Sequence, residues 1–230
     1  MNNKIRLVIA VAGVLVLFTF YIFSREVKRG FLKQQDFNMT VRLQDHIPAR
    51  LDGIWETIAL PVTPAPSVFV VGLFTLAMLV DFRKKSAQGG SALGRKIRLR
   101  ALIIPLLFGL IVMGELYGKS VVHHPSPPFF MLKHPTTVFP QFYVNEQFSY
   151  PSGHTSRAVF LGMVLFSWLT GSWDAWVKNW RKTIIIACAI LAYSITVAVG
   201  RIYLGSHWLS DILGGGLLGA GLGLFSLAVL

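Results

Sequence analysis

The chain has 230 residues, of which 53% are hydrophobic, and a mean hydropathy of +0.58. This composition weighs against a soluble domain and indicates an integral membrane protein. The formal net charge of +12 does not indicate a nucleic-acid-binding protein, because the basic residues stand in short segments beside apolar runs, where they fix topology and meet anionic lipid. Cys188 is the only cysteine, which excludes a disulfide or a cysteine metal site within one chain.

Six apolar runs predict an all-α, polytopic membrane bundle of six transmembrane helices. They are residues 5–23, 54–80, 101–118, 158–169, 183–199 and 212–230, and several approach the ~20 residues that a helix needs to cross the hydrocarbon core. No cleavage site follows the first run, so we expect a retained anchor. We expect one membrane domain over residues 1–230, with 1–35 as the anchor and its flank. The last run contains a glycine series typical of a close-packing face, Gly214, Gly215, Gly216, Gly219, Gly221 and Gly223.

The charges between the runs predict the orientation. Residues 83–100 carry seven Lys and Arg and no acid, which places this segment in the cytoplasm. An even number of spans then puts both termini on the same side. Residues 24–53, which we expect to include an amphipathic segment at the membrane surface, carry six basic residues against this rule. Because residues 24–53 also carry four acids, the acid-free segment 83–100 is the stronger indication of the cytoplasmic side.

Three polar segments adjoin these runs and fall on one side of the membrane. Lys119 ends the third run, residues 151–157 begin the fourth, and residues 201–211 join the fifth and sixth. An even number of crossings separates each pair of segments, so all three face the side opposite to residues 83–100. Ionisable side chains at membrane depth are costly and usually mark a functional site.

The start of the fourth run, residues 151–157, has two interpretations. One is an anion site, because helix N-termini present unpaired N–H groups and Gly153 lets the backbone come close to a ligand. His154 would then supply or accept a proton near neutral pH. The other is a plain helix start, capped by Ser152 or Thr155.

The segment between the last two runs contains a histidine and a carboxylate four residues apart. On a helix, His207 and Asp211 share a face, so that the carboxylate fixes the tautomer of the imidazole. This is half of a nucleophile and orienter arrangement like that of hydrolytic triads. Alone, the pair is a common helix-surface feature, but Arg201 and His154 on the same side give it weight.

Three short patterns stand in order on this side. They read Lys119-x7-Pro127 with Ser126 before the proline, then Pro151-Ser152-Gly153-His154, then Gly200-Arg201-x5-His207-x3-Asp211. Together they resemble the motifs K-x6-R-P, P-S-G-H and S-R-x5-H-x3-D of the type 2 phosphatidic acid phosphatase family, which shares its core with vanadium-dependent haloperoxidases. Ser126 stands where the family has arginine, and Gly200 where it has serine. The resemblance extends from about residue 36 to the C-terminus, so we expect residues 36–230 to form a phosphatase-like core.

The resemblance implies a phosphoryl transfer that uses no metal and no cofactor. In it, His207 attacks phosphorus and forms a phosphohistidine, while Asp211 holds its tautomer. His154 protonates the leaving oxygen and later activates water. The phosphate oxygens are held by Lys119, Arg201 and the amides around Ser152 and Gly153. Positioning and charge stabilisation are what this reaction needs.

Ser126 removes one charge-assisted contact that the family makes to phosphate. Lys133, His123 or His124 could substitute, since all lie in the same segment. A weakened or retuned enzyme is the opposite outcome, but we expect activity to survive because the nucleophile, its orienter and the acid are all present. The same histidines with His134 could suggest a metal site, yet no carboxylate or cysteine completes one, and we expect none.

Two charged residues near this site have structural interpretations. Glu115 is predicted to pair with Lys119 at i, i+4. Arg157 either contacts the phosphate or extends to lipid headgroups, and the second role is favoured.

The leading interpretation is a membrane lipid phosphatase in a bacterial inner (cell) membrane, with its site facing the periplasm or exterior. The substrate implied is a lipid phosphate or diphosphate, such as undecaprenyl diphosphate, phosphatidylglycerophosphate or phosphatidate. The alternative is a catalytically weakened or non-enzymatic lipid-handling or transport protein of the same fold, and a haloperoxidase-like vanadate enzyme is a third, less favoured one. The bilayer is the expected partner and nucleic acid is not, while the choice of lipid and the oligomeric state stay open.

Overall fold

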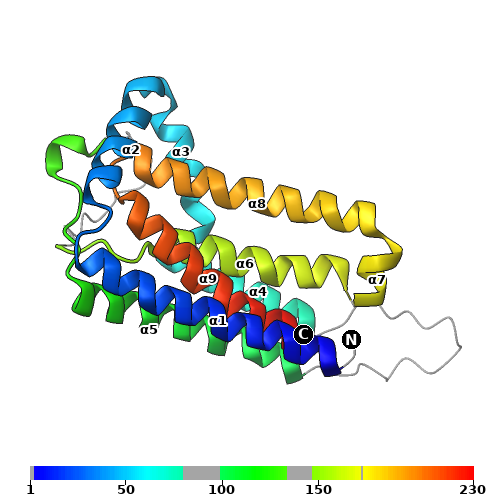
Figure 1. Ribbon diagram of the computed structural model, residues 1–230. Coiled ribbons are helices and arrows are strands. Elements are labelled where there is room, and N and C mark those ends of the chain that lie inside the picture. The colour runs from blue at the N-terminus through cyan, green and yellow to red at the C-terminus, as the bar shows by residue number, and fades with distance from the viewer. Residues whose placement is uncertain (1–2, 80–98, 134–146, 172) are drawn as a thin grey trace, which may run out of the picture.

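The computed structural model describes residues 3–79, 99–133, 147–171 and 173–230. Its long helices lie side by side in one bundle (Figure 1). They are α1 (Asn3–Lys28), α4 (Pro64–Leu79), α5 (Ile103–Val122), α6 (Gly153–Thr170), α8 (Trp180–Tyr203) and α9 (Leu209–Val229). The shorter α2 (Lys33–His46) and α3 (Asp52–Ala59) lie at one end of the bundle, while α7 (Trp173–Lys178), the start of α1 and the end of α9 lie at the other (Figure 1). The predicted all-α class is confirmed.

Four helices in the described ranges are long and apolar enough to cross a membrane, namely α1, Arg100–Val122, α8 and α9. A fifth crossing results if Ala49–Val62 and Pro64–Leu79, which are bent by 46° at their junction, count as one span. The six predicted spans are therefore not confirmed, because residues 158–169 lie in α6, which is not among these helices. Its first turn is polar and it is buried along most of its length, so it needs less apolar surface than a helix facing lipid.

The main core forms where α6 packs against α5, α8 and α9. Phe160 and Val164 of α6 share one buried cluster with Ile111 of α5, Val197 of α8 and Leu222 of α9. Lipid tails are as apolar as these side chains, so close packing rather than escape from water holds such helices together. This packing fixes the first turn of α6 relative to its neighbours.

Glycines let α9 lie directly against α6. A Cβ added at Gly215 would overlap the carbonyl oxygen of Ser152. Gly219 and Gly223 approach α6 in the same way, whereas Gly214 faces the Tyr150 ring and Gly221 faces Leu17 of α1. The predicted close-packing face is confirmed at these positions, whereas Gly216 has no such neighbour among the described residues. As a result the Ser152 N–H donates to the carbonyl oxygen of Asp211 at 2.9 Å.

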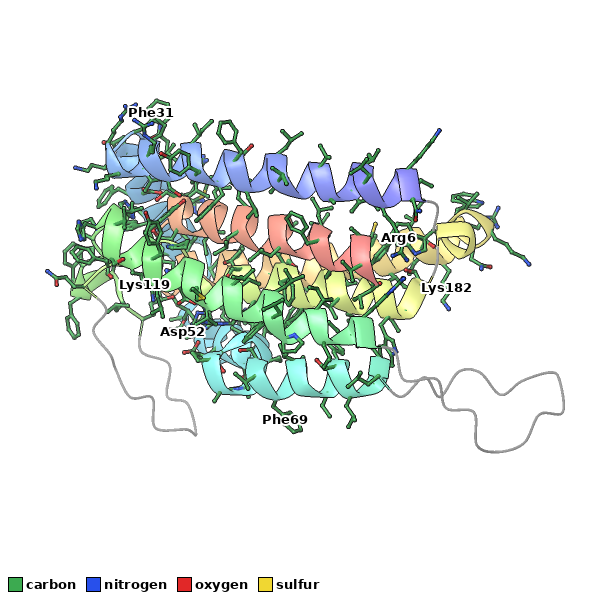
Figure 2. The ribbon with its side chains drawn as sticks, turned by 90° about the horizontal axis from the view of Figure 1, so that it is seen from below. Arg6, Phe31, Asp52, Phe69, Lys119 and Lys182 are labelled. Atoms are coloured by element: carbon green, nitrogen blue, oxygen red, sulfur yellow. The ribbon has the colours of Figure 1, made fainter. Side chains whose placement is uncertain are left out.

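The two ends of the bundle carry different segments of the chain. Asp52 and Lys119 lie at one end, and Arg6 and Lys182 lie at the other (Figure 2). Arg100, the last residue of the basic segment 83–100, stands just before α5, whereas Lys119 stands in its last turn. The rest of that segment lies almost entirely outside the described residues. Lys119 therefore belongs to the end of the bundle opposite to Arg100.

Candidate functional site

The polar segments predicted to share one side meet at the end of the bundle that carries α2 and α3. The Arg157 guanidinium contacts the Glu115 carboxylate at 2.5 Å and so joins α6 to α5. The imidazole rings of His154 on α6 and His207, just before α9, lie 6.1 Å apart between their centroids. The predicted convergence of these segments is therefore confirmed.

Ser152 is the N-cap of α6. Thr155 donates its N–H to Ser152 Oγ at 3.4 Å and its hydroxyl to the same atom at 3.2 Å. Ser152, rather than Thr155, therefore fills the capping role. At the next residue, Gly153, an added Cβ would overlap the Glu115 carboxylate. Only glycine allows α5 and its charged side chains to approach the start of α6 so closely.

Two cations share the Glu115 carboxylate. Lys119 Nζ lies 3.1 Å from Oε1, which confirms the predicted i, i+4 pair, and Arg157 Nη2 lies 2.5 Å from Oε2. The favoured prediction that Arg157 extends to lipid headgroups is wrong, because this residue is only 5% exposed. A buried carboxylate is stable only with cationic partners, so Glu115 draws Arg157 inward.

Arg201 has an ion-pair partner that the sequence did not indicate. It is buried near the end of α8 and forms an ion pair with Glu56 of α3. Glu56 lies within residues 54–80, which the sequence predicts as a span interrupted by Pro61, Pro64 and Pro66. An acid at that place is costly in a membrane helix, and it was a second signal, beside the prolines, that the segment is broken. The structure ends α3 at Ala59 and places η2 (Leu60–Val62) before α4.

His207 contacts Asp211, although the two do not share one helix as predicted. Helix α9 starts at Leu209 with Trp208 as its N-cap, and Asp211 accepts the Trp208 N–H at 2.9 Å. His207 Nδ1 lies 3.4 Å from Asp211 Oδ2, across this first turn. Before this helix, Gly205 turns the chain with φ of 70°, and a Cβ added there would overlap the carbonyl oxygen of Met131.

The residues proposed to compensate for Ser126 have other partners. His124 is buried, with Nδ1 2.9 Å from Asp211 Oδ1. His123 is exposed and its ring lies 4.8 Å from that of Phe148. Lys133 donates to the Tyr203 hydroxyl at 3.1 Å. The Ser126 N–H donates to the carbonyl oxygen of Gln147 at 3.3 Å, so Ser126 lies beside the chain that leads into α6.

The metal interpretation gains no support from these positions. His134 lies outside the described residues, and His123 and His124 face different partners. Within the described ranges, no group of three or more histidine, cysteine or acidic side chains is arranged to hold a metal ion.

The positive groups around His154 suit an oxyanion. Lys119, Arg157 and Arg201 all lie close enough to act on His154 electrostatically. In the described part of the chain, the Nε atoms of Arg157 and Arg201 are buried donors without a hydrogen-bond acceptor. Buried N–H groups are normally paired, and a phosphate group offers several strong acceptor oxygens. This arrangement can hold a phosphate group beside two imidazole rings.

Comparison with known proteins identifies relatives of both the sequence and the fold. The sequence profile of the PAP2 superfamily matches residues 98–230, which is more than half of the chain. Phosphatidylglycerophosphatase B of Bacillus subtilis is 30% identical over 118 residues, covering 51% of this chain and 52% of that protein. A dihydrosphingosine 1-phosphate phosphatase of Saccharomyces cerevisiae is 28% identical over 129 residues, covering 56% of this chain and 30% of the relative. These matches therefore span about half, or less, of the curated relatives.

One solved structure resembles nearly the whole chain. The transmembrane PAP2 type phosphatidylglycerolphosphate phosphatase from Bacillus subtilis gives a TM-score of 0.68, and the match covers 94% of this chain and 93% of that one. The two sequences are 20% identical, so this likeness shows a shared fold.

Proposed function

Because this chain belongs to the PAP2 superfamily and folds as a multi-pass integral membrane protein, we propose that it is a lipid phosphate phosphatase acting through a phosphohistidine. One observation carries the proposal: the His154 and His207 rings lie 6.1 Å apart beside buried cations. Two imidazoles this close can contact one phosphoryl group, one as nucleophile and the other as acid and base.

The first half of the reaction uses the two ring nitrogens of His207 differently. Nδ1 faces Asp211, so Nε2 is the atom that attacks phosphorus. As the Nε2–P bond forms, the P–O bond to the ester oxygen of a monoester, or to the bridging oxygen of a diphosphate, breaks, and the leaving oxygen takes a proton from His154. The products are the free alcohol of the lipid, or a lipid monophosphate from a diphosphate, and phosphorylated His207.

The second half restores the enzyme. His154, now neutral, takes a proton from water, whose oxygen attacks phosphorus while the P–Nε2 bond breaks. Inorganic phosphate leaves and His207 is regenerated. Throughout, the phosphate oxygens are stabilised by Lys119, Arg157, Arg201 and the N–H groups around Ser152 and Gly153. Phosphoryl transfer depends mainly on such positioning and charge stabilisation.

Phosphatidylglycerophosphate is the first substrate to test, because the names of both Bacillus subtilis relatives point to it. Phosphatidate and undecaprenyl diphosphate are the next candidates. The tails would enter laterally between helices from a bacterial cell membrane. Arg100 lies just before α5 and Lys119 lies in its last turn, so the positive-inside rule supports a site on the extracytoplasmic side.

Phosphate release from a panel of substrates tests this proposal. The purified full chain in lipid nanodiscs would be given phosphatidylglycerophosphate, phosphatidate and undecaprenyl diphosphate, with glycerol 3-phosphate as the matched substrate without tails. We expect release from at least one lipid and much slower release from glycerol 3-phosphate. Folded protein that releases no phosphate from any of them would support the non-enzymatic alternative instead.

The Arg157→Met variant is expected to lower kcat/KM by about 10²–10³-fold, because one preorganised donor to the transferring group is lost. The same steady-state phosphate assay measures it. Exposed Arg42 on α2 supplies the matched control, and Arg42→Met should leave the rate unchanged.

A double variant separates phosphate binding by Arg157 from its structural pairing. Arg157→Met with Glu115→Gln removes both charges of the buried pair. If Arg157 contacts the phosphate, the double variant stays as slow as the single one. Full recovery of the rate in the double variant would mean that Arg157 serves only as the ionic partner of Glu115.

The Ser126→Arg variant should change the rate of phosphate release little, because Arg157 already supplies the cation.

A further inference from the structure

The carboxylate of Asp211 is shared by two imidazoles. It is fully buried, and its Oδ2 accepts the Trp208 N–H at 2.9 Å and faces His207 Nδ1 at 3.4 Å. Its Oδ1 lies 2.9 Å from Nδ1 of His124, which is 7% exposed. An ionised carboxylate only accepts hydrogen bonds, so His124 Nδ1 carries the hydrogen. Of the two imidazole contacts with Asp211, the one made by His124 is the shorter.

A second buried carboxylate stands behind His124. Asp36 of α2 is 2% exposed, and its Oδ2 lies 3.7 Å from His124 Nε2. Ser210, in the first turn of α9, donates its N–H to Asp36 Oδ1 at 2.7 Å and its hydroxyl to Oδ2 at 2.9 Å. Burial raises the pKa of the Asp36 carboxyl, and the hydrogen bonds from Ser210 oppose that shift. Helix α2 is thus tied to the same turn of α9 that carries Asp211.

We propose that His124 and Asp36 form an outer positioning pair that fixes the Asp211 carboxylate with Oδ2 toward His207. The proposal rests on the proposed function, because it assigns Asp211 the role of orienting His207. Neither member of the pair need touch the substrate. From the sequence, His124 was predicted to have a different role, as a substitute cation for phosphate.

Two donors on different oxygens are what set the plane of this carboxylate. The Trp208 N–H binds Oδ2 and the His124 N–H binds Oδ1, so rotation about the last side-chain bond would break both. Asp36 in turn limits rotation of the His124 ring by facing its other nitrogen. Outer partners that orient a functional histidine typically change activity by about 10–100-fold when removed, as known from metal sites. We expect an effect of that size.

Substitutions of His124 by asparagine and by leucine test the pair, because only asparagine can donate a hydrogen bond to Asp211. The Asn amide nitrogen sits near the position of Nδ1 and can donate to Asp211, whereas Leu fills similar space without a donor. We expect His124→Leu to lower kcat by about 10–100-fold with KM unchanged, and His124→Asn to retain most of the rate. Asp36→Asn should lower kcat by a smaller factor. His46→Asn and Asp45→Asn, at exposed positions of α2, are the matched controls.

A measurement without substrate keeps this test separate from the proposed function. The ¹⁵N and ¹H shifts of the His207 Nδ1–H group report its contact with Asp211. In folded protein, we expect them to change in His124→Leu and to stay close to wild type in His124→Asn. Wild-type shifts in His124→Leu would overturn the proposal, as would a raised KM at unchanged kcat, which would return His124 to phosphate binding. An inactive wild type would refute the proposed function. The His207 shifts would then decide on their own whether His124 positions Asp211.

Discussion

The His207→Ala variant is expected to lose phosphate release from every lipid substrate, by about 10⁴-fold or more, because alanine cannot form the covalent intermediate. The nucleophile acts as a unit with its orienter and the acid, so the remaining groups cannot replace it. Single-turnover experiments with ³²P-labelled lipid should show acid-labile, alkali-stable label on the wild type. The same label should be missing from His207→Ala, while the variant elutes and unfolds like the wild type.

His46 is the matched control for this loss. It lies at the end of α2, is exposed, and its Nδ1 is 2.8 Å from the carbonyl oxygen of Arg42 in its own helix. His46→Ala should therefore release phosphate at the wild-type rate. If His207→Ala retained turnover within about tenfold of the wild type, the nucleophile would have to be another group. Lipid transport by a wild type that hydrolyses no lipid phosphate, unchanged in His207→Ala, would favour the non-enzymatic alternative.

The meeting of the three polar segments could be predicted from the sequence, because membrane helices leave few arrangements. One connection joins the third and fourth apolar runs, another joins the last two, and both lie on the same side of the membrane. Lys119, residues 151–157 and residues 201–211 adjoin these connections and therefore share that side. The three segments can share this side without all six runs being lipid-facing spans. Helix α6 is not among the helices of the described ranges that are long and apolar enough to cross a membrane, yet it delivers His154 to the site.

Directions of individual side chains could not be predicted in this way. His123 and His124 are adjacent and look equivalent in the sequence. His123 adopts a left-handed conformation, with φ of 54°, at the end of α5, and the chain turns there. One ring then faces Phe148 at the surface, while the other reaches the buried Asp211. A turn conformation of this kind has no strong sequence signal when the residue is not glycine.

Arg157 illustrates a second limit, which is set by a partner on another helix. Taken alone, an arginine in the first turn of a membrane helix extends toward headgroups. Here Glu115 projects from α5 against Gly153 and is buried, so its carboxylate attracts the Arg157 guanidinium inward in addition to Lys119. Glu115 itself was predicted to pair only with Lys119 on its own helix. Pairing between helices depends on their packing, which spacing along one helix cannot give.

The His154→Ala variant is expected to slow release from a lipid phosphate monoester by about 10²–10⁴-fold, the usual contribution of a general acid or base. The loss should depend on the leaving group. The alkoxide of a lipid alcohol needs a proton to depart, whereas the nitrophenolate of p-nitrophenyl phosphate departs without one. With that substrate, His154→Ala should still phosphorylate His207, but water attack on the phosphohistidine should be slow.

A burst of nitrophenolate is therefore the diagnostic result. His154→Ala should release about one equivalent per enzyme rapidly and then turn over slowly, as expected when a covalent intermediate accumulates. The labelled phosphoenzyme should persist in this variant and decay quickly in the wild type. An equal loss on both substrates with no burst would mean that His154 positions the phosphate rather than transferring protons. Because the two rings lie 6.1 Å apart, the contrast between His154→Ala and His207→Ala assigns acid and nucleophile within one cluster.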